Sequence, residues 1–317
     1  MNVKFKVVRK TSRLAWFATE SGRKFSKGCV ITFGFGTFFA NCLPHSLFLD
    51  TYREVYQRYN KSYPVRVTAK IKKQFNAVLD DLEVPDHIRG LIKPFIVNGF
   101  DLIHAGSTNL RSGVIIGIPL SFNYEELKDI DESTLVLEAK NVDWKSAEGQ
   151  NLLSSMLLSE EAKKFAIAQK VWRCQSHEIW MNCIFPMVST AFAYTIAHRA
   201  NVLLDSFHHP PIFRICLYTF VGMFSIATWA ALKDFAAMQY DSECDEELCK
   251  LGKDYIKGGQ EYYGKILQRN VALRSLLGDY GAKLYSVKGN EQFLLRQKRM
   301  PLVHRKLYFD EQMKSLR

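Results

Sequence analysis

Three long stretches of this chain contain no Lys, Arg, Asp or Glu, although these four residue types make up 24% of its 317 residues. The stretches run from Gly28 to Leu49, from Ile179 to Ala197 and from Ile215 to Leu232, and each is 18 to 22 residues long. As helices that rise about 1.5 Å per residue they would be roughly 27 to 33 Å long, close to the thickness of bilayer hydrocarbon. The sequence therefore predicts a membrane protein with three spanning helices.

Most of the excess positive charge lies in front of the first uncharged stretch. The chain has a net charge of +11, and residues 1–27 alone contain eight Lys or Arg and a single acid, Glu20. A nucleic-acid-binding protein would instead spread its basic residues over a folded face, so we expect no nucleic-acid partner. A basic leader that is poor in acids is typical of a mitochondrial targeting segment, and an uncleaved signal anchor fits it equally well.

The predicted fold class is a membrane protein of the α+β type, with a mixed peripheral domain and a helical C-terminal region. The predicted segments are a basic leader at 1–27, spans at 28–49, 179–197 and 215–232, a peripheral domain at 50–178, a hairpin connection at 198–214 and the C-terminal region at 233–317. Within 50–84 the apolar residues recur at helical spacing and predict two helices. The apolar runs LIKPFIV, SGVIIGIPLSF and STLVLEA predict strands between residues 91 and 138.

Helix boundaries are predicted from capping residues and from Gly and Pro. Ser159 is a candidate N-cap, and the helix after it is expected to continue into the second span because no Gly or Pro intervenes before Pro186. In the C-terminal region a helix is expected to follow the acidic patch DSECDEE and to end at Gly258–Gly259. A second helix is expected to end at Gly278.

Metal-ligand motifs are weak throughout. His177–Glu178 resembles the start of a zinc-peptidase motif, but that motif needs a second His one turn later, where this chain has Met181. His208–His209 lacks a third ligand nearby in the sequence. We therefore predict no metal ligand, no cofactor-binding residue and no catalytic residue, and no enzymatic activity.

Two further features concern pairing and packing. Cys244 and Cys249 point in different directions on a helix, so a disulfide between them requires a non-helical acidic patch.

Asn41 and His45 are polar residues within the first stretch, near its end, where an interfacial position is expected. Small residues in the third span favour close helix packing; they are Gly222, Ser225 and Ala227.

Two long segments carry a resemblance to a known family. The segments are NVDWKSAEGQNLLSSMLLSEEAKKFAIAQKV at 141–171 and GGQEYYGKILQRNVALRSLLGDYGAKLYSVKGN at 258–290. Both resemble blocks of the transmembrane protein 177 family, and GVIIGIPLSF at 113–122 is similar to a further piece. With the order of the spans, the resemblance covers most of residues 28–290.

The resemblance implies a multi-pass protein of the mitochondrial inner membrane that supports biogenesis of cytochrome c oxidase, an enzyme of the respiratory chain. It implies chaperone-like association with newly made oxidase subunit 2, its assembly chaperone and copper-delivery factors, without catalysis and without a small-molecule substrate. The basic leader predicts an N-terminus in the matrix, so that three spans would place 50–178 and the C-terminus in the intermembrane space.

An alternative from another class stays open. The order of a span, a strand-containing domain, a helix leading to His177–Glu178 and a helical hairpin resembles integral-membrane zinc peptidases whose motif has degenerated. This hypothesis predicts that Cys174 and His177 meet Glu243 or Glu246 at one point.

Overall fold

The computed structural model describes residues 16–17, 19–131, 143–206 and 209–316. They form two compact units. We name the first the helical unit; it comprises the described residues up to Cys42 together with Trp180–Lys233. The second, which we name the body, comprises Leu43–Ile179 and the described residues from Asp234 onward.

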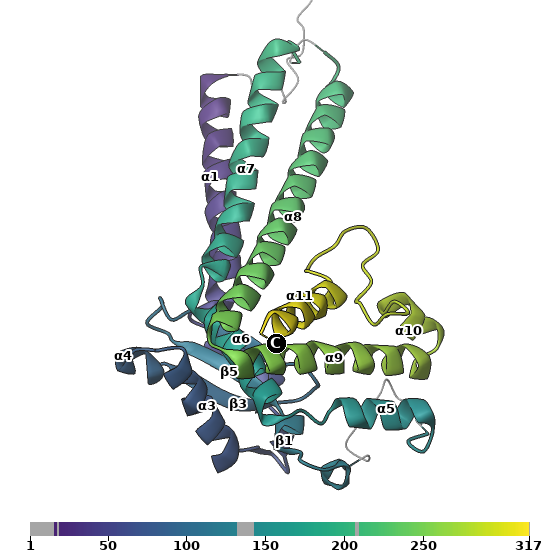
Figure 1. Cartoon of the computed structure of the whole chain (residues 1–317). Helices are drawn as coiled ribbons and strands as arrows, with labels where there is room; N and C mark the ends of the chain where they lie inside the picture. Colours follow the sequence, from purple (N-terminus) through teal and green to yellow (C-terminus); the bar gives the residue numbers. More distant parts are fainter. Residues whose placement is uncertain (1–15, 18, 132–142, 207–208, 317) are drawn as a thin grey trace, which may run out of the picture. The chain divides into compact units, whose positions relative to one another are not determined.

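The helical unit consists of helix α1 (Glu20–Cys42), nearly all of α7 (Glu178–Leu203) and the first part of α8 (Pro211–Lys250). The three run side by side (Figure 1). Small residues allow their close approach, since Gly34 of α1 faces the Met187 side chain of α7. The Ser189 hydroxyl of α7 donates to the carbonyl oxygen of Ser225 on α8 at 2.8 Å. Ser225 therefore has the predicted packing role.

Two of these helices are long and apolar enough to cross a membrane. They are α7 and α8, with mean hydropathies of 1.3 and 1.7 in their most apolar windows. Only 22% and 11% of those windows are buried within the protein, whereas the core helix of a water-soluble domain would be mostly buried. The second and third predicted spans lie within α7 and α8.

Three spans are not confirmed, because α1 does not meet the same test. The predicted span 28–49 is not one helix. Helix α1 begins earlier, at Glu20, takes in Lys24 and Lys27, and ends at Cys42. A short 3-10 turn, η2 (Leu43–His45), follows, because the ring of Pro44 supplies no N–H for a continuing helix.

The body is built on a three-stranded sheet of order β3-β5-β4. Strand β5 (Val114–Pro119) lies in the middle, parallel to β3 (Ile92–Val97) and antiparallel to β4 (Ile103–Gly106). Since side chains alternate along a strand, Ile116 packs into the main core while Ile115 packs with a second cluster. The main core includes residues of α3 (Ala69–Asp81) and α6 (Glu160–Gln175), and the second includes residues of α2 (Leu49–Tyr56).

The two predicted helices within 50–84 are confirmed as α2 and α3, and two predicted strands as β3 and β5. Strand β4 was not predicted, and the run at 133–139 lies outside the described residues. The smaller elements are β1 (Tyr59–Asn60), β2 (Tyr63–Pro64), α4 (Asp86–Arg89), η3 (Leu120–Asn123), η4 (Leu127–Asp129), α5 (Ala147–Ser155) and α10 (Asp279–Leu284).

Helix α9 (Lys253–Leu276) organises the C-terminal half of the body and contacts α5, α6, α10 and α11 (Leu302–Ser315) (Figure 1). The prediction that Gly258–Gly259 ends a helix is wrong, because both glycines lie inside α9. Their missing side chains let α9 approach the backbone of α6 at Glu161 and the ring of Phe309 on α11. The break that separates α8 from α9 is at Gly252, whose φ of +115° favours glycine, while Gly278 follows the end of α9 as predicted.

The predicted continuation of the 159–175 helix into the second span is also wrong. Ser159 does cap α6, accepting from the backbone N–H of Ala162 at 3.2 Å, but α6 ends at Gln175. Ser176 is extended, donates to the carbonyl oxygen of Arg173 and accepts from the N–H of Glu178. The Ser176 hydroxyl thus bonds backbone groups at the end of α6 and at the start of α7. Such side-chain hydrogen bonds compete with helical ones, so the first helix ends here and a second one begins.

We predict that Gly258→Ala destabilises the body by about 1–3 kcal/mol, because a Cβ there would overlap the carbonyl group of Glu161. The matched control is Gly264→Ala in the same helix, where the nearest atom is the flexible Cε of Lys306 at 3.6 Å. The control should be neutral or stabilise by up to about 1 kcal/mol, because Ala favours helix over Gly. Denaturant unfolding of the full-length chain in detergent measures both, and equal effects would contradict the assigned packing.

Candidate functional site

A cluster of four buried charged side chains joins three helices of the body. Arg173 lies on α6, Asp241 and Asp245 lie one helical turn apart on α8, and Arg305 lies on α11. All four are buried, with Asp241 fully so. We call these four residues the ionic cluster. Charged groups are almost never fully buried unless they are paired, so the arrangement requires close partners.

The pairing within the ionic cluster is close to complete. The Arg305 guanidinium donates to both carboxylate oxygens of Asp245 at 2.6 Å, and its Nη1 donates to Asp241 at 2.9 Å. Arg173 donates to the same Oδ1 atom of Asp241. The backbone N–H of Met300 also donates to Asp241, at 3.3 Å. Two guanidinium groups thus face two carboxylates, and the planar Arg305 engages one of them through two parallel hydrogen bonds.

Neutral side chains extend the cluster into the aromatic core. The Tyr263 hydroxyl donates to Asp245 at 2.8 Å and accepts from the Gln169 amide at 2.7 Å. The Arg305 guanidinium also lies 4.7 Å from the centre of the Tyr263 ring, within range of a cation–π attraction. Burial raises the pKa of Tyr263 well above its ordinary value, so this hydroxyl stays a hydrogen-bond donor at physiological pH.

Glu178, at the start of α7, forms an ion pair with the cluster but no hydrogen bond to it. Its Oε2 atom lies 3.5 Å from Nη1 of Arg173, and neither atom makes a hydrogen bond. The ion pair nevertheless explains why Glu178 turns inward while its neighbour His177 is exposed.

The chemistry of these side chains favours a structural role over a catalytic one. Guanidinium groups do not act as proton acceptors at physiological pH, and both aspartates already accept hydrogen bonds from arginine. Cys174 and Cys244 lie close by, but burial raises the pKa of each thiol well above its ordinary value. A buried thiol of this kind is a poor nucleophile. The ionic cluster is therefore suited to fixing α6, α8 and α11 to one another.

The peptidase-like hypothesis requires Cys174 and His177 to lie together with Glu243 or Glu246. Within the described residues, no group of three or more His, Cys, Asp or Glu could hold a metal ion. Cys174 is buried and His177 is exposed. Glu243 and Glu246 instead accept hydrogen bonds from neighbours on their own helix, α8.

The other candidate residues are dispersed. Cys244 and Cys249 are both free, because α8 continues through the acidic patch and points them apart. His208 lies outside the described residues, and the His209 ring lies beside Phe213. The amide of Asn41 donates to the carbonyl oxygen of Thr37 in its own helix. His45 lies in η2, where its Nδ1 accepts from the N–H of Gly106 at 3.4 Å.

Sequence reasoning missed the ionic cluster. The sequence predicts a helix that follows the acidic patch DSECDEE, whereas the patch itself lies inside α8. Once the patch is helical, the four-residue spacing of Asp241 and Asp245 places both on one face. Arg305 falls in a C-terminal stretch for which the sequence indicated no partner.

We predict that Arg305→Met lowers the free energy of unfolding by about 3–5 kcal/mol, because it leaves Asp241 and Asp245 buried without their main partner. Lys250→Met is the matched control on α8: Lys250 is exposed and its pair with Glu247 should contribute under about 1 kcal/mol. Denaturant unfolding of the full-length chain in detergent is the measurement. A similar loss in both variants would contradict a structural role for the cluster.

Comparison with known proteins identifies the family. The family model described as Transmembrane protein 177 matches residues 46–297. The chain is 33% identical to transmembrane protein 177 of Danio rerio over 257 residues, which cover 80% of this chain and 82% of that protein. It is 29% identical to the Xenopus laevis protein over 300 residues (93% and 96%) and 31% identical to the Homo sapiens protein over 257 residues (80% and 81%).

No solved structure matches the chain. The segment matched by the family model contains Arg173, Asp241 and Asp245 and ends before Arg305. It also contains both helices that are long and apolar enough to span a membrane. The resemblance expected from the segments at 141–171 and 258–290 is thereby confirmed, and the chain belongs to the transmembrane protein 177 family.

Proposed function

We propose that this protein is a non-catalytic assembly factor of the mitochondrial inner membrane, which stabilises newly made cytochrome c oxidase subunit 2 while its chaperone and copper-delivery factors act on it. The observation that carries the proposal is membership of the transmembrane protein 177 family across residues 46–297. The basic leader supports a mitochondrial location.

The division of the chain supports a body that lies on one side of the membrane. The body contains the chain before α7 and the chain after the first part of α8. Two crossings, one by each helix, return the chain to the side that it left. In this proposal α1 also crosses the membrane, from an N-terminus in the matrix, so the body lies in the intermembrane space, where the copper domain of subunit 2 is exposed.

The apolar surface of α8 supports lateral contact with a partner's membrane helix. Phe220 and Phe224 are 73% and 59% exposed, respectively, while Ser225 on the same helix is taken up by its contact with α7. Helices associate in lipid through van der Waals packing, and the exposed side chains of α8 are the surface available for it. The partner's helix would pack on the face that carries these two phenylalanines.

We predict that deletion of the protein shortens the lifetime of newly made subunit 2 more than that of newly made subunit 1. Pulse labelling of mitochondrial translation products, followed by a chase, measures both lifetimes, and the wild-type chain should restore the first. Affinity capture of the tagged chain should also recover subunit 2 and its chaperone. Unchanged lifetimes together with no recovery of subunit 2 would overturn the proposal.

A variant tests the contact surface within the same experiment. Phe220→Ala with Phe224→Ala keeps the helix apolar but removes the exposed rings, so capture of subunit 2 should fall several-fold. The control is Val287→Ala, an equally exposed apolar side chain in the body, which should leave capture unchanged. Equal capture by both variants would place the contact elsewhere on the protein.

A further inference from the structure

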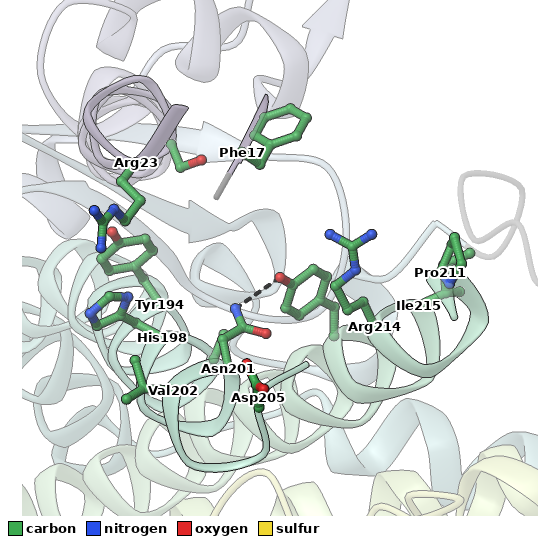
Figure 2. A pocket seen from close by; sticks show the side chains of 13 residues that line it. Phe17, Arg23, Tyr194, His198, Asn201, Val202, Asp205, Pro211, Arg214 and Ile215 are labelled. Atoms are coloured by element: carbon green, nitrogen blue, oxygen red, sulfur yellow. Dashed lines mark hydrogen bonds between the residues drawn. The ribbon is translucent and has the colours of Figure 1, made fainter. Parts of the chain in front are cut away.

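The helical unit contains a cavity of about 670 Å³ where α1, α7 and α8 come together at one end. This volume is in the range of pockets that bind small molecules. Figure 2 shows Arg23 of α1 and Arg214 of α8 on different sides of the cavity, with Tyr194 and His198 of α7 near Arg23. All the lining residues belong to the helical unit, so the cavity does not involve the body.

The positions of the basic residues along the chain indicate the level in the bilayer at which the cavity would lie. His198 directly follows the uncharged stretch that ends at Ala197, and Arg214 directly precedes the one that begins at Ile215. Arg23 lies a little more than one helical turn before the uncharged part of α1. If α7 and α8 span a bilayer, the cavity therefore opens at the level where hydrocarbon meets the phosphate groups of the lipids.

The lining combines positive charge with apolar walls. Arg214 is a guanidinium that is only 9% exposed, and Arg23 supplies a second one. Asp205 is the single acid among the lining residues, so the two arginines leave a positive balance before His198 is counted. Guanidinium groups bind phosphate oxygens through paired, charge-assisted hydrogen bonds.

Polar groups that carry no charge complete the cavity. The Asn201 amide donates to the Tyr218 hydroxyl at 2.9 Å, which joins the end of α7 to the start of α8 (Figure 2). Val202 and Ile215 provide apolar surface, and Ile215 continues onto the face of α8, where it is 59% exposed. An acyl chain leaving the cavity would find this face directly beside it.

We propose that this cavity binds the phosphate headgroup of an anionic phospholipid, with Arg23 and Arg214 as the phosphate-binding residues. The proposal rests on the membrane placement of α7 and α8 and is independent of any contact with subunit 2. A phospholipid fits better than free phosphate because the charged end of the cavity adjoins apolar surface that a free anion would not use. Bound lipid would hold the three helices together at this end.

The test is a titration of the full-length chain in detergent with short-chain phosphatidylglycerol, followed by the thermal unfolding midpoint. A ligand that binds only the folded protein raises this midpoint with concentration. We expect saturable stabilisation by phosphatidylglycerol, and little by short-chain phosphatidylcholine or by inorganic phosphate at equal ionic strength. Equal stabilisation by inorganic phosphate would assign the site to a free anion, and no difference between the two lipids would overturn the proposal.

Arginine variants identify the site. Arg23→Gln should weaken phosphatidylglycerol binding about tenfold, which corresponds to about 1.4 kcal/mol, because it removes a charge-assisted hydrogen bond to phosphate. Arg23 is exposed, so this variant should fold, whereas Arg214→Gln is a second variant at a more buried position. Arg199→Gln removes an adjacent exposed charge that does not line the cavity and should leave binding unchanged. Equal weakening by Arg199→Gln and Arg23→Gln would show general surface attraction and overturn the proposal.

Discussion

The ion pairs between Arg305 and the two aspartates of α8 are the interaction on which the architecture of the body depends. They join the last part of α8 to α11, and Cys244 and Leu248 of the same part of α8 pack into the core that includes residues of α6 and α11. A buried charge pair costs desolvation energy and contributes little net stability compared with an apolar contact. Its value here is specificity, because α8 can be accommodated only where both aspartates meet guanidinium groups.

The two helices that are candidate spans also supply charged residues to the body. Helix α8 is 40 residues long and begins in the helical unit, so the helix that supplies a candidate span also supplies two residues of the ionic cluster. In the other helix of the hairpin, Glu178 is the first residue of α7 and pairs with Arg173 of the cluster. Glu178 of α7 and the two aspartates of α8 all belong to the body, where they pair with arginines.

Much of this organisation could be predicted from the sequence, and the failures have physical causes. Uncharged length predicted α7 and α8, and apolar runs predicted β3 and β5, because each signal is local. The prediction that Gly258–Gly259 ends a helix fails because sequence alone does not distinguish a glycine that ends a helix from one that lets a neighbouring helix pack closely. The ionic cluster stayed hidden because Arg173 and Arg305 reach Asp241 across more than 60 residues of chain, and pairing over that separation depends on tertiary structure.

The most direct test of the account asks whether the two halves of the body lie on the same side of the membrane. One epitope is placed in the exposed turn at Lys61–Ser62 and another at the C-terminus, and mitochondria are treated with protease before and after rupture of the outer membrane. A pair of crossings by α7 and α8 predicts that both epitopes respond to the protease alike. The proposed position of the body in the intermembrane space predicts that both are protected in intact mitochondria and are digested together after rupture. Digestion of one epitope while the other stays protected would contradict the account, because a body assembled from both segments cannot be divided by a bilayer.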